Sequence, residues 1–207
     1  MLIIDIETTG LRPSPTPKDL AEGIQEDYIV AIGILDTQTG CMEIFSAPHS
    51  IFSVSLANTE KMIILNFCRW FVNQQKPIFL SYNGIDFDIP FIVSKLLKYD
   101  KEETNGLSTV LLSTPHIDLI RFSVRVSGRR MQKETACRKL GNLYVPRKSE
   151  GLWCARIYSN PQLLTANDHL DMLQHNATDL SATGRLYNVL KQFPDFETWV
   201  EEQIGSE

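Results

Sequence analysis

Two carboxylates near the N-terminus, Asp5 and Glu7, stand at the end of an apolar run that begins at Met1. Residues i and i+2 of a β-strand project from the same face, so the run predicts two carboxylates side by side at the end of a buried strand. Adjacent like charges repel unless a cation neutralises them, and hard ions such as Mg²⁺ prefer carboxylate oxygens. The pair therefore predicts a divalent metal site, although a strand that simply ends in solvent would show the same pattern.

Two further acidic positions are candidates for the same site. Asp88 lies in SYNGIDFDIPFI, between a predicted strand and a predicted helix, and open α/β sheets bind ligands at the carboxyl ends of their strands. Asp88 would also stabilise the helix N-terminus through the helix dipole, and the nearby Asp86 is interpreted as a turn residue. His175 and Asp179 are four residues apart on a predicted helix and share a face, which a solvated helix surface would also explain.

The elements that must position these side chains can be predicted from apolar periodicity and from capping, turn and breaker residues. By residue number, the predicted strands are 1–6, 28–36, 41–45, 78–81 and 116–120, and the predicted helices are 58–75, 90–98, 133–140, 151–158 (one or two turns), 165 or 167 to 191, and 195–204. The second and third strands form a hairpin with Gly40 in its turn. This order predicts an α/β fold with a mixed sheet, in a single domain of residues 1–207 with a short helical appendage at 195–207.

The composition is that of an ordinary globular protein, with 43% hydrophobic and 22% charged residues. No run of 18 apolar residues occurs, so we expect no membrane span, and we identify no signal peptide. The four cysteines are far apart and form no C-x-x-C pair, so we expect reduced thiols in a cytoplasmic protein. They are Cys41, Cys68, Cys137 and Cys154.

The net charge of −5 argues at first against a nucleic-acid partner, but the basic residues are concentrated in one segment. Between residues 121 and 148 only Glu134 is acidic, and nine residues are basic: Arg121, Arg125, Arg129, Arg130, Lys133, Arg138, Lys139, Arg147 and Lys148. Such a segment can attract a polyanion locally even when the whole protein is acidic. A solvated basic surface without a ligand is the alternative.

Three motifs together resemble those of the DEDD superfamily of 3'→5' exonucleases: DIETTG at Asp5, YNGIDFDIPFI around Asp88, and HNATD ending at Asp179. The second motif and the HIDLI stretch are most similar to the exonuclease domains of family-B DNA polymerases, and the match extends over residues 1 to 190. The third motif departs from the pattern, because His175 has the residue type of one subgroup at the tyrosine spacing of the other. The resemblance implies an RNase H-like fold, with three antiparallel strands followed by parallel strands and flanked by helices.

The resemblance also implies a mechanism and a set of site residues. Two Mg²⁺ or Mn²⁺ ions would be held by Asp5, Glu7, Asp88 and Asp179. His175 would orient the attacking water or accept its proton, because an imidazole titrates near neutral pH. Thr8 and Leu11 would contact the terminal nucleotide and Asn83 would line the site. In the alternative interpretation, Thr8 is a turn residue and Leu11 a core residue.

The expected activity is 3'→5' exonucleolytic hydrolysis of single-stranded nucleic acid to 5'-mononucleotides, with DNA favoured over RNA. The expected partner is the 3' end of single-stranded DNA or RNA, and a replication or repair protein is a possible second one. Tyr144 or Trp153 could stack on bases, but both residue types are more often buried in a core. The alternatives are a ribonuclease that trims RNA 3' ends and a non-catalytic module of the same fold that binds nucleic acid or a replication partner.

Overall fold

The computed structural model describes residues 1–12, 14, 16–21, 26–52, 54–99, 106–144, 158 and 163–205. The helical turns predicted at 151–158 lie outside the described residues, apart from Tyr158. Arg147, Lys148, Trp153 and Cys154 also lie outside them.

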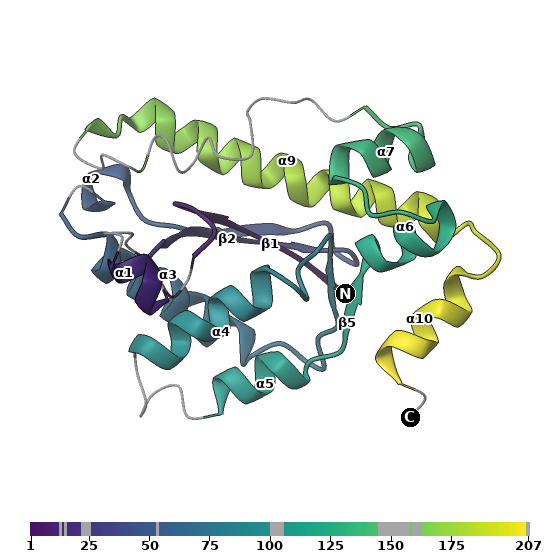
Figure 1. The fold of residues 1–207 in the computed structure, drawn as a ribbon, viewed down its shortest axis with the longest axis horizontal. Coiled ribbons are helices and arrows are strands. Elements are labelled where there is room, and N and C mark those ends of the chain that lie inside the picture. The colour runs from purple at the N-terminus through teal and green to yellow at the C-terminus, as the bar shows by residue number, and fades with distance from the viewer. Residues whose placement is uncertain are drawn as a thin grey trace.

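A five-stranded mixed sheet of order β3-β2-β1-β4-β5 forms the centre of the fold (Figure 1). Its strands are β1 (Leu2–Thr8), β2 (Ile29–Asp36), β3 (Met42–Phe45), β4 (Phe79–Ser81) and β5 (His116–Asp118). The first three strands are antiparallel to one another, whereas β4 runs parallel to β1 and β5 parallel to β4. The predicted mixed sheet is therefore confirmed, with β1 in the middle. The carboxyl ends of β1, β4 and β5 lie at the same edge of the sheet, because these strands are parallel.

The last predicted strand is wrong at its end, because residues 119–120 are already helical. The carboxylate of Asp118 accepts a hydrogen bond from the backbone N–H of Ile120, and this cap begins a helix in place of further strand. The helices among the described residues are α1 (Pro17–Ala21), α2 (His49–Phe52), α3 (Leu56–Phe71), α4 (Asp88–Tyr99), α5 (Leu107–Ser113), α6 (Leu119–Ser127), α7 (Lys133–Gly141), α9 (Ala166–Leu190) and α10 (Phe196–Ile204).

The long helix α9 begins at a capping box. The Thr165 hydroxyl accepts from the backbone N–H of Asp168, and the Asp168 carboxylate accepts from the backbone N–H of Thr165 in return. Of the two predicted caps, Thr165 is therefore the one used. The box fixes where α9 starts, and with it the direction in which every later side chain of the helix projects.

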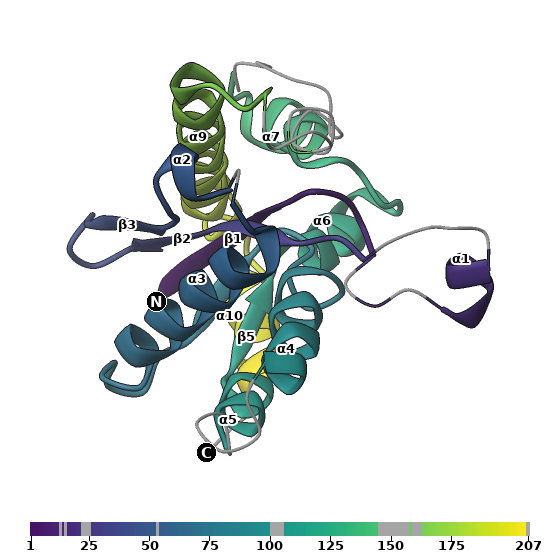
Figure 2. The same cartoon turned by 90° about the vertical axis from the view of Figure 1, so that its left-hand side faces the viewer.

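The sheet lies between two helical layers, with α9 and α7 over one face and α3, α4 and α5 over the other (Figures 1 and 2). Alternate residues of β1 supply both cores. Leu2, Ile4 and Ile6 pack in the cluster that contains α3 and α4, whereas Ile3 packs in the cluster that contains Leu180 of α9. Asp5 has the same parity as Ile3, so the strand alternation directs its carboxylate toward the α9 layer.

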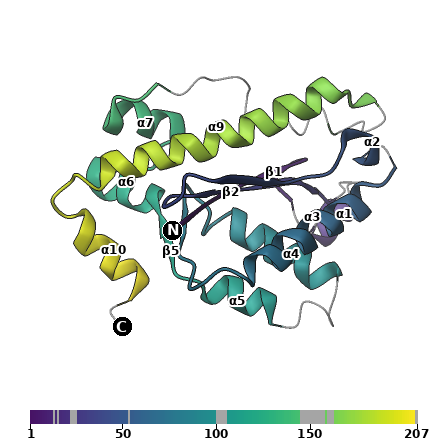
Figure 3. The ribbon, with the colours of Figure 1, turned by 180° about the vertical axis from the view of Figure 1, so that it is seen from behind.

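The C-terminal helix α10 shares a core with the rest of the fold. The buried Phe196 and Trp199 rings pack against Phe122 of α6, with ring centroids 4.8 and 5.0 Å apart. Figure 3 shows α10 on the far side of α6 and β5 from α7. In the described ranges, no helix combines the length and the apolar character needed to cross a membrane.

Candidate active site

The first strand and the last long helix bring two carboxylates to one point. The Lys133 ammonium nitrogen lies 3.0 Å from Asp5 Oδ1 and 2.7 Å from Asp179 Oδ2. Asp5 comes from β1 and Asp179 from the middle of α9, which packs directly on β1. Two acidic groups that are far apart in the sequence therefore contact the same positive charge.

Lys133 was not among the predicted site residues, although it belongs to the basic segment. It is the first residue of α7, and the preceding loop is held to the end of β4 by a hydrogen bond from the Tyr82 hydroxyl to the Met131 carbonyl, 2.8 Å long. Burial alone would lower the pKa of the Lys133 ammonium, but the adjacent Asp5 and Asp179 carboxylates reverse this and raise its pKa above the usual range. Lys133 is therefore a fixed positive charge inside the site.

Asp88 is the first residue of α4 and joins the same site from there, whereas Asp179 comes from α9 on the other face of the sheet (Figure 1). Asp88 Oδ1 accepts a hydrogen bond of 2.9 Å from the backbone N–H of Ile6, one residue beyond Asp5. Burial, followed by the repulsion of the nearby Asp5 carboxylate, raises the pKa of Asp88 to about 8. Burial likewise raises the pKa of Asp5, against the lowering effect of Lys133. Both carboxylates are therefore held in a buried position where their charged forms are less favourable than in water.

The loop that carries Asn83 and leads to Asp88 is fixed by two side chains from the parallel strands. The Asp118 carboxylate accepts from the backbone N–H groups of Asn83 and Ile85, at 2.6 and 3.1 Å. The Ser81 hydroxyl accepts from the N–H of Gly84 at 3.0 Å. Asp118 therefore has a structural role in the HIDLI stretch, because it both begins α6 and holds the loop in front of Asp88.

Glu7 and His175 form a second pair of side chains from β1 and α9. His175 Nε2 lies 4.0 Å from Glu7 Oε1, and His175 stands one helical turn before Asp179 on α9. Glu7 is 8% exposed and has the same strand parity as Asp5, as the D-x-E spacing predicted. An imidazole thus stands beside the second carboxylate of β1.

A hollow of about 430 Å³ lies over these groups. Six of the eight predicted site residues line it: Asp5, Glu7, Asn83, Asp88, His175 and Asp179. Thr8 and Leu11 are not among the described residues that line it. The Thr8 hydroxyl donates to the Gly10 carbonyl, and Leu11 is 66% exposed, so the alternative assignment of Leu11 to the core is wrong.

The residue types fit a hard divalent cation, because two carboxylates contact a position that already holds a positive charge and two more line the same hollow. The arrangement is nevertheless closed by Lys133. Among the described residues, no three histidine, cysteine or acidic side chains are gathered closely enough to hold one metal ion. A metal ion at this position would have to take over the contacts that Asp5 and Asp179 make with Lys133, and Glu7 or Asp88 would have to turn toward it.

Asn176 is a second site residue that was not predicted. Its side-chain amide donates to both the backbone carbonyl and Oδ2 of Asp5, at 3.2 and 3.1 Å, and it is fully buried. The only signal in the sequence is its place inside HNATD, between two predicted site residues. The apolar periodicity of α9 does not predict that residue 176 is buried, because asparagine is a polar residue on the buried face of the helix.

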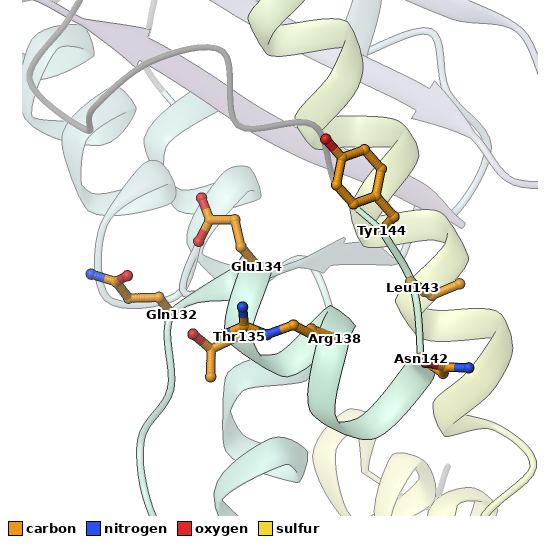
Figure 4. A pocket seen from close by; sticks show the side chains of 7 residues that line it. All are labelled: Gln132, Glu134, Thr135, Arg138, Asn142, Leu143 and Tyr144. Carbon is orange, nitrogen blue, oxygen red and sulfur yellow. The ribbon is translucent and has the colours of Figure 1, made fainter.

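A second hollow, of about 460 Å³, adjoins the first across the N-terminus of α7, since Gln132 and Glu134 line both. Figure 4 shows it between the exposed side of α7 and the segment that carries Tyr144. Arg138 lines its floor, and the Tyr144 ring is 80% exposed. The two hollows are therefore neighbours, and together, as the depression, they reach from the carboxylates to Tyr144.

Part of the basic segment is neutralised within the molecule. Arg130 Nη2 lies 3.6 Å and Arg121 Nη2 3.8 Å from the Asp86 carboxylate, and Arg125 pairs with Glu202 at 3.1 Å. Arg130 also donates to the Asn83 side chain and lines the first hollow. The positive charge that remains at the depression is therefore smaller than the sequence count suggests.

Three antiparallel strands followed by two parallel ones, with an acidic cluster at the end of β1, define an RNase H-like α/β protein. A family model described as the RNase H superfamily matches residues 2–191, and the chain belongs to that superfamily. A search of curated proteins found no match. This membership indicates nuclease-type hydrolase chemistry in general. Nucleases with an RNase H-like fold typically use divalent metals.

Proposed function

We propose that the protein is a metal-dependent 3'→5' exonuclease that hydrolyses single-stranded nucleic acid, DNA in preference to RNA, and releases 5'-mononucleotides. The observation that carries the proposal is the convergence of Asp5 and Asp179 on one cation position. Glu7, Asp88 and His175 line the same hollow, which makes it the place where a phosphodiester would meet both carboxylates and an imidazole.

Each residue has a role that its contacts support. Asp5 and Asp179 would hold the first ion, and Glu7 and Asp88 would complete the ligands of a pair of Mg²⁺ or Mn²⁺ ions. When bound, such a pair supplies a water of lowered pKa and stabilises the attacking and leaving oxygens of the displacement. His175, beside Glu7, would orient the attacking water or accept its proton. Because the pKa of Asp88 is raised, its carboxyl group would release a proton when a cation binds there.

The depression next to the carboxylates suits a single strand. Arg130 at the first hollow and Arg138 at the second can contact phosphates, and the exposed Tyr144 ring can stack on a base. Charge and stacking recognise any sequence, as an exonuclease requires. By the same resemblance, Thr8 and Leu11 stay as the residues proposed to contact the terminal nucleotide, and Asn83 stays as a residue that lines the site.

The direct test uses purified protein with Mg²⁺ or Mn²⁺ and single-stranded DNA and RNA labelled at either the 5' or the 3' end. The 5'-labelled strands should shorten stepwise, and the 3'-labelled strands should release labelled mononucleotide first. Asp5→Asn and Asp179→Asn, which remove the charge and keep the size, should abolish release. Asp171→Asn is the matched control, because Asp171 is an exposed acid on the same helix.

Full activity in both the Asp5 and the Asp179 variants would show that the metal assignment is wrong. Internal cleavage without release from the 3' end would show an endonuclease. Comparing DNA and RNA strands of the same sequence distinguishes the proposed DNA exonuclease from a ribonuclease that trims RNA 3' ends. The 2'-hydroxyl is the feature by which a site can distinguish RNA from DNA.

One observation favours a second candidate, a non-catalytic module of the same fold that binds nucleic acid or a replication or repair partner. Lys133 already neutralises Asp5 and Asp179, so the carboxylates have a structural partner without any metal. Tight binding of single strands with no hydrolysis at any Mg²⁺ or Mn²⁺ concentration would support this candidate against the exonuclease.

A further inference from the structure

We propose that Asn176 is a positioning residue that fixes the rotation of the Asp5 carboxylate so that one of its oxygens faces the metal; this inference rests on the proposed function. The Asn176 amide nitrogen donates to Asp5 Oδ2 at 3.1 Å and to the Asp5 backbone carbonyl at 3.2 Å. One rigid amide therefore links the side chain of Asp5 to its own main chain. Asp5 Oδ1 is directed to the Lys133 ammonium instead.

The sheet makes room for this amide at one position. Gly33 on β2 is the cross-strand partner of Asp5, and a Cβ at Gly33 would lie 1.9 Å from Asn176 Oδ1 and 2.8 Å from Leu180 Cδ1. Any larger residue there would displace the amide from its present position against Asp5. Asn176 of α9 thus packs on Gly33 of β2 and donates to Asp5 of β1. The glycine is necessary at this position of β2, because a side chain there would occupy the space of the Asn176 amide.

The amide is held at a cost in stability. Asn176 is fully buried, and among the described residues its Oδ1 has no hydrogen-bond partner. A buried polar atom without a partner is unfavourable, whereas a leucine of similar size would fill the same space without that penalty. The unpaired oxygen offsets part of what the two hydrogen bonds to Asp5 contribute, so the asparagine adds little net stability and is explained by what it does to Asp5.

An uncharged donor suits this task. A lysine or arginine in its place would neutralise Asp5 and compete with a metal ion, and an aspartate would repel it. Groups that hold a metal ligand from behind typically change metal affinity by about 10–100-fold when they are removed. The same range is expected for Asn176.

The test is Mn²⁺ binding to the complete protein, measured by isothermal titration calorimetry and by the electron paramagnetic resonance signal of free Mn²⁺. Asn176→Leu should raise the Kd for Mn²⁺ about 10–100-fold. Its thermal unfolding midpoint in EDTA should stay close to that of the wild type, because the loss of the two hydrogen bonds to Asp5 is offset by the loss of the unpaired oxygen, whereas a mainly structural role would give a clear fall. Asn188→Leu, an exposed asparagine three turns later on α9, is the matched control and should leave the Kd unchanged.

Gly33→Ala provides an independent route, because it keeps the asparagine and displaces its amide. It should also weaken Mn²⁺ binding, and the double variant Gly33→Ala/Asn176→Ala should bind no more weakly than Asn176→Ala alone. A wild-type Kd in both Asn176→Leu and Gly33→Ala would overturn the inference and leave the proposed function standing. A Kd that worsens only in step with a fall in the unfolding midpoint would assign Asn176 a structural role and overturn it too. A wild-type protein that binds no Mn²⁺ and hydrolyses no strand would overturn both.

Discussion

Replacing Lys133 by methionine removes the positive charge that the described residues place between Asp5 and Asp179, and it keeps the length and the apolar stem of the side chain. The three side chains are only 12%, 19% and 20% exposed, so water screens their charges weakly. Breaking a buried ion pair by removing one partner typically costs about 3–5 kcal/mol, because the remaining charge is left without a counter-ion. Partial exposure places Lys133 at the lower end, about 3 kcal/mol.

That loss should be visible as a fall in thermal stability. A change of 1 kcal/mol shifts the midpoint of a chain of this size by about 2–4 °C, so Lys133→Met should lower the unfolding midpoint by about 6–12 °C in EDTA. Saturating Mg²⁺ or Mn²⁺ should reduce the difference from the wild type, because the metal neutralises the same carboxylates. Metal affinity should rise in the variant, since no ammonium has to be displaced from Asp5 and Asp179.

The assay is thermal unfolding followed by circular dichroism, in EDTA and over a metal titration, with Lys139→Met as control. Lys139 is an exposed lysine on the same helix, and its loss should change the midpoint little. Equal midpoints for the Lys133 and Lys139 variants in EDTA would refute the reasoning about the buried charge. If saturating metal does not reduce the difference between the unfolding midpoints of Lys133→Met and the wild type, the idea that metal and the Lys133 ammonium occupy the same position is refuted.

Three further outcomes are expected. His175→Ala should reduce the rate of nucleotide release by about 10²–10⁴-fold with Mn²⁺ affinity retained, and an unchanged rate would assign the attacking water to another group. Burial, aided by the positive charge of Arg121, lowers the pKa of His116 to about 4, so the neutral imidazole beside the Ser81 hydroxyl stabilises the fold fully above pH 6.5 and loses that effect as the pH falls toward 4. The free energy of unfolding by urea should fall by about 3 kcal/mol over that window for this group, and His116→Gln should remove that part of the pH dependence. Replacing Arg138 or Tyr144 by alanine should reduce kcat/KM for an eight-nucleotide strand more than for a dinucleotide, and an equal reduction for both lengths would place the second hollow outside the strand's path.

The parts of the site that the sequence predicted depend on local geometry. The i, i+2 spacing placed Asp5 and Glu7 on one strand face, and the strand alternation of β1 decided which helical layer that face meets. The cap at Thr165 and the four-residue spacing placed His175 and Asp179 together on α9. Strand and helix periods are short-range properties, so a single sequence is enough to read them.

The parts that were missed depend on contacts between distant residues. Nothing near Lys133 in the sequence indicates that its ammonium lies 3.0 Å from Asp5, 128 residues away. Asn176 is found only once α9 is laid on β1, because its partner is a strand residue and its space comes from Gly33 on β2. The strand predicted to reach residue 120 ended early because the Asp118 side chain capped a helix, a competition between two local signals that periodicity alone does not resolve.

The most direct measurement of the central claim is the anomalous scattering of Mn²⁺ in crystals of the wild-type protein grown or soaked with the metal. We expect a Mn²⁺ peak bound by the carboxylates of Asp5 and Asp179, a second ion nearby toward Asp88, and the Lys133 ammonium moved off the position between them. A saturated soak that leaves Lys133 bridging Asp5 and Asp179, with no Mn²⁺ peak at either carboxylate, would contradict the account.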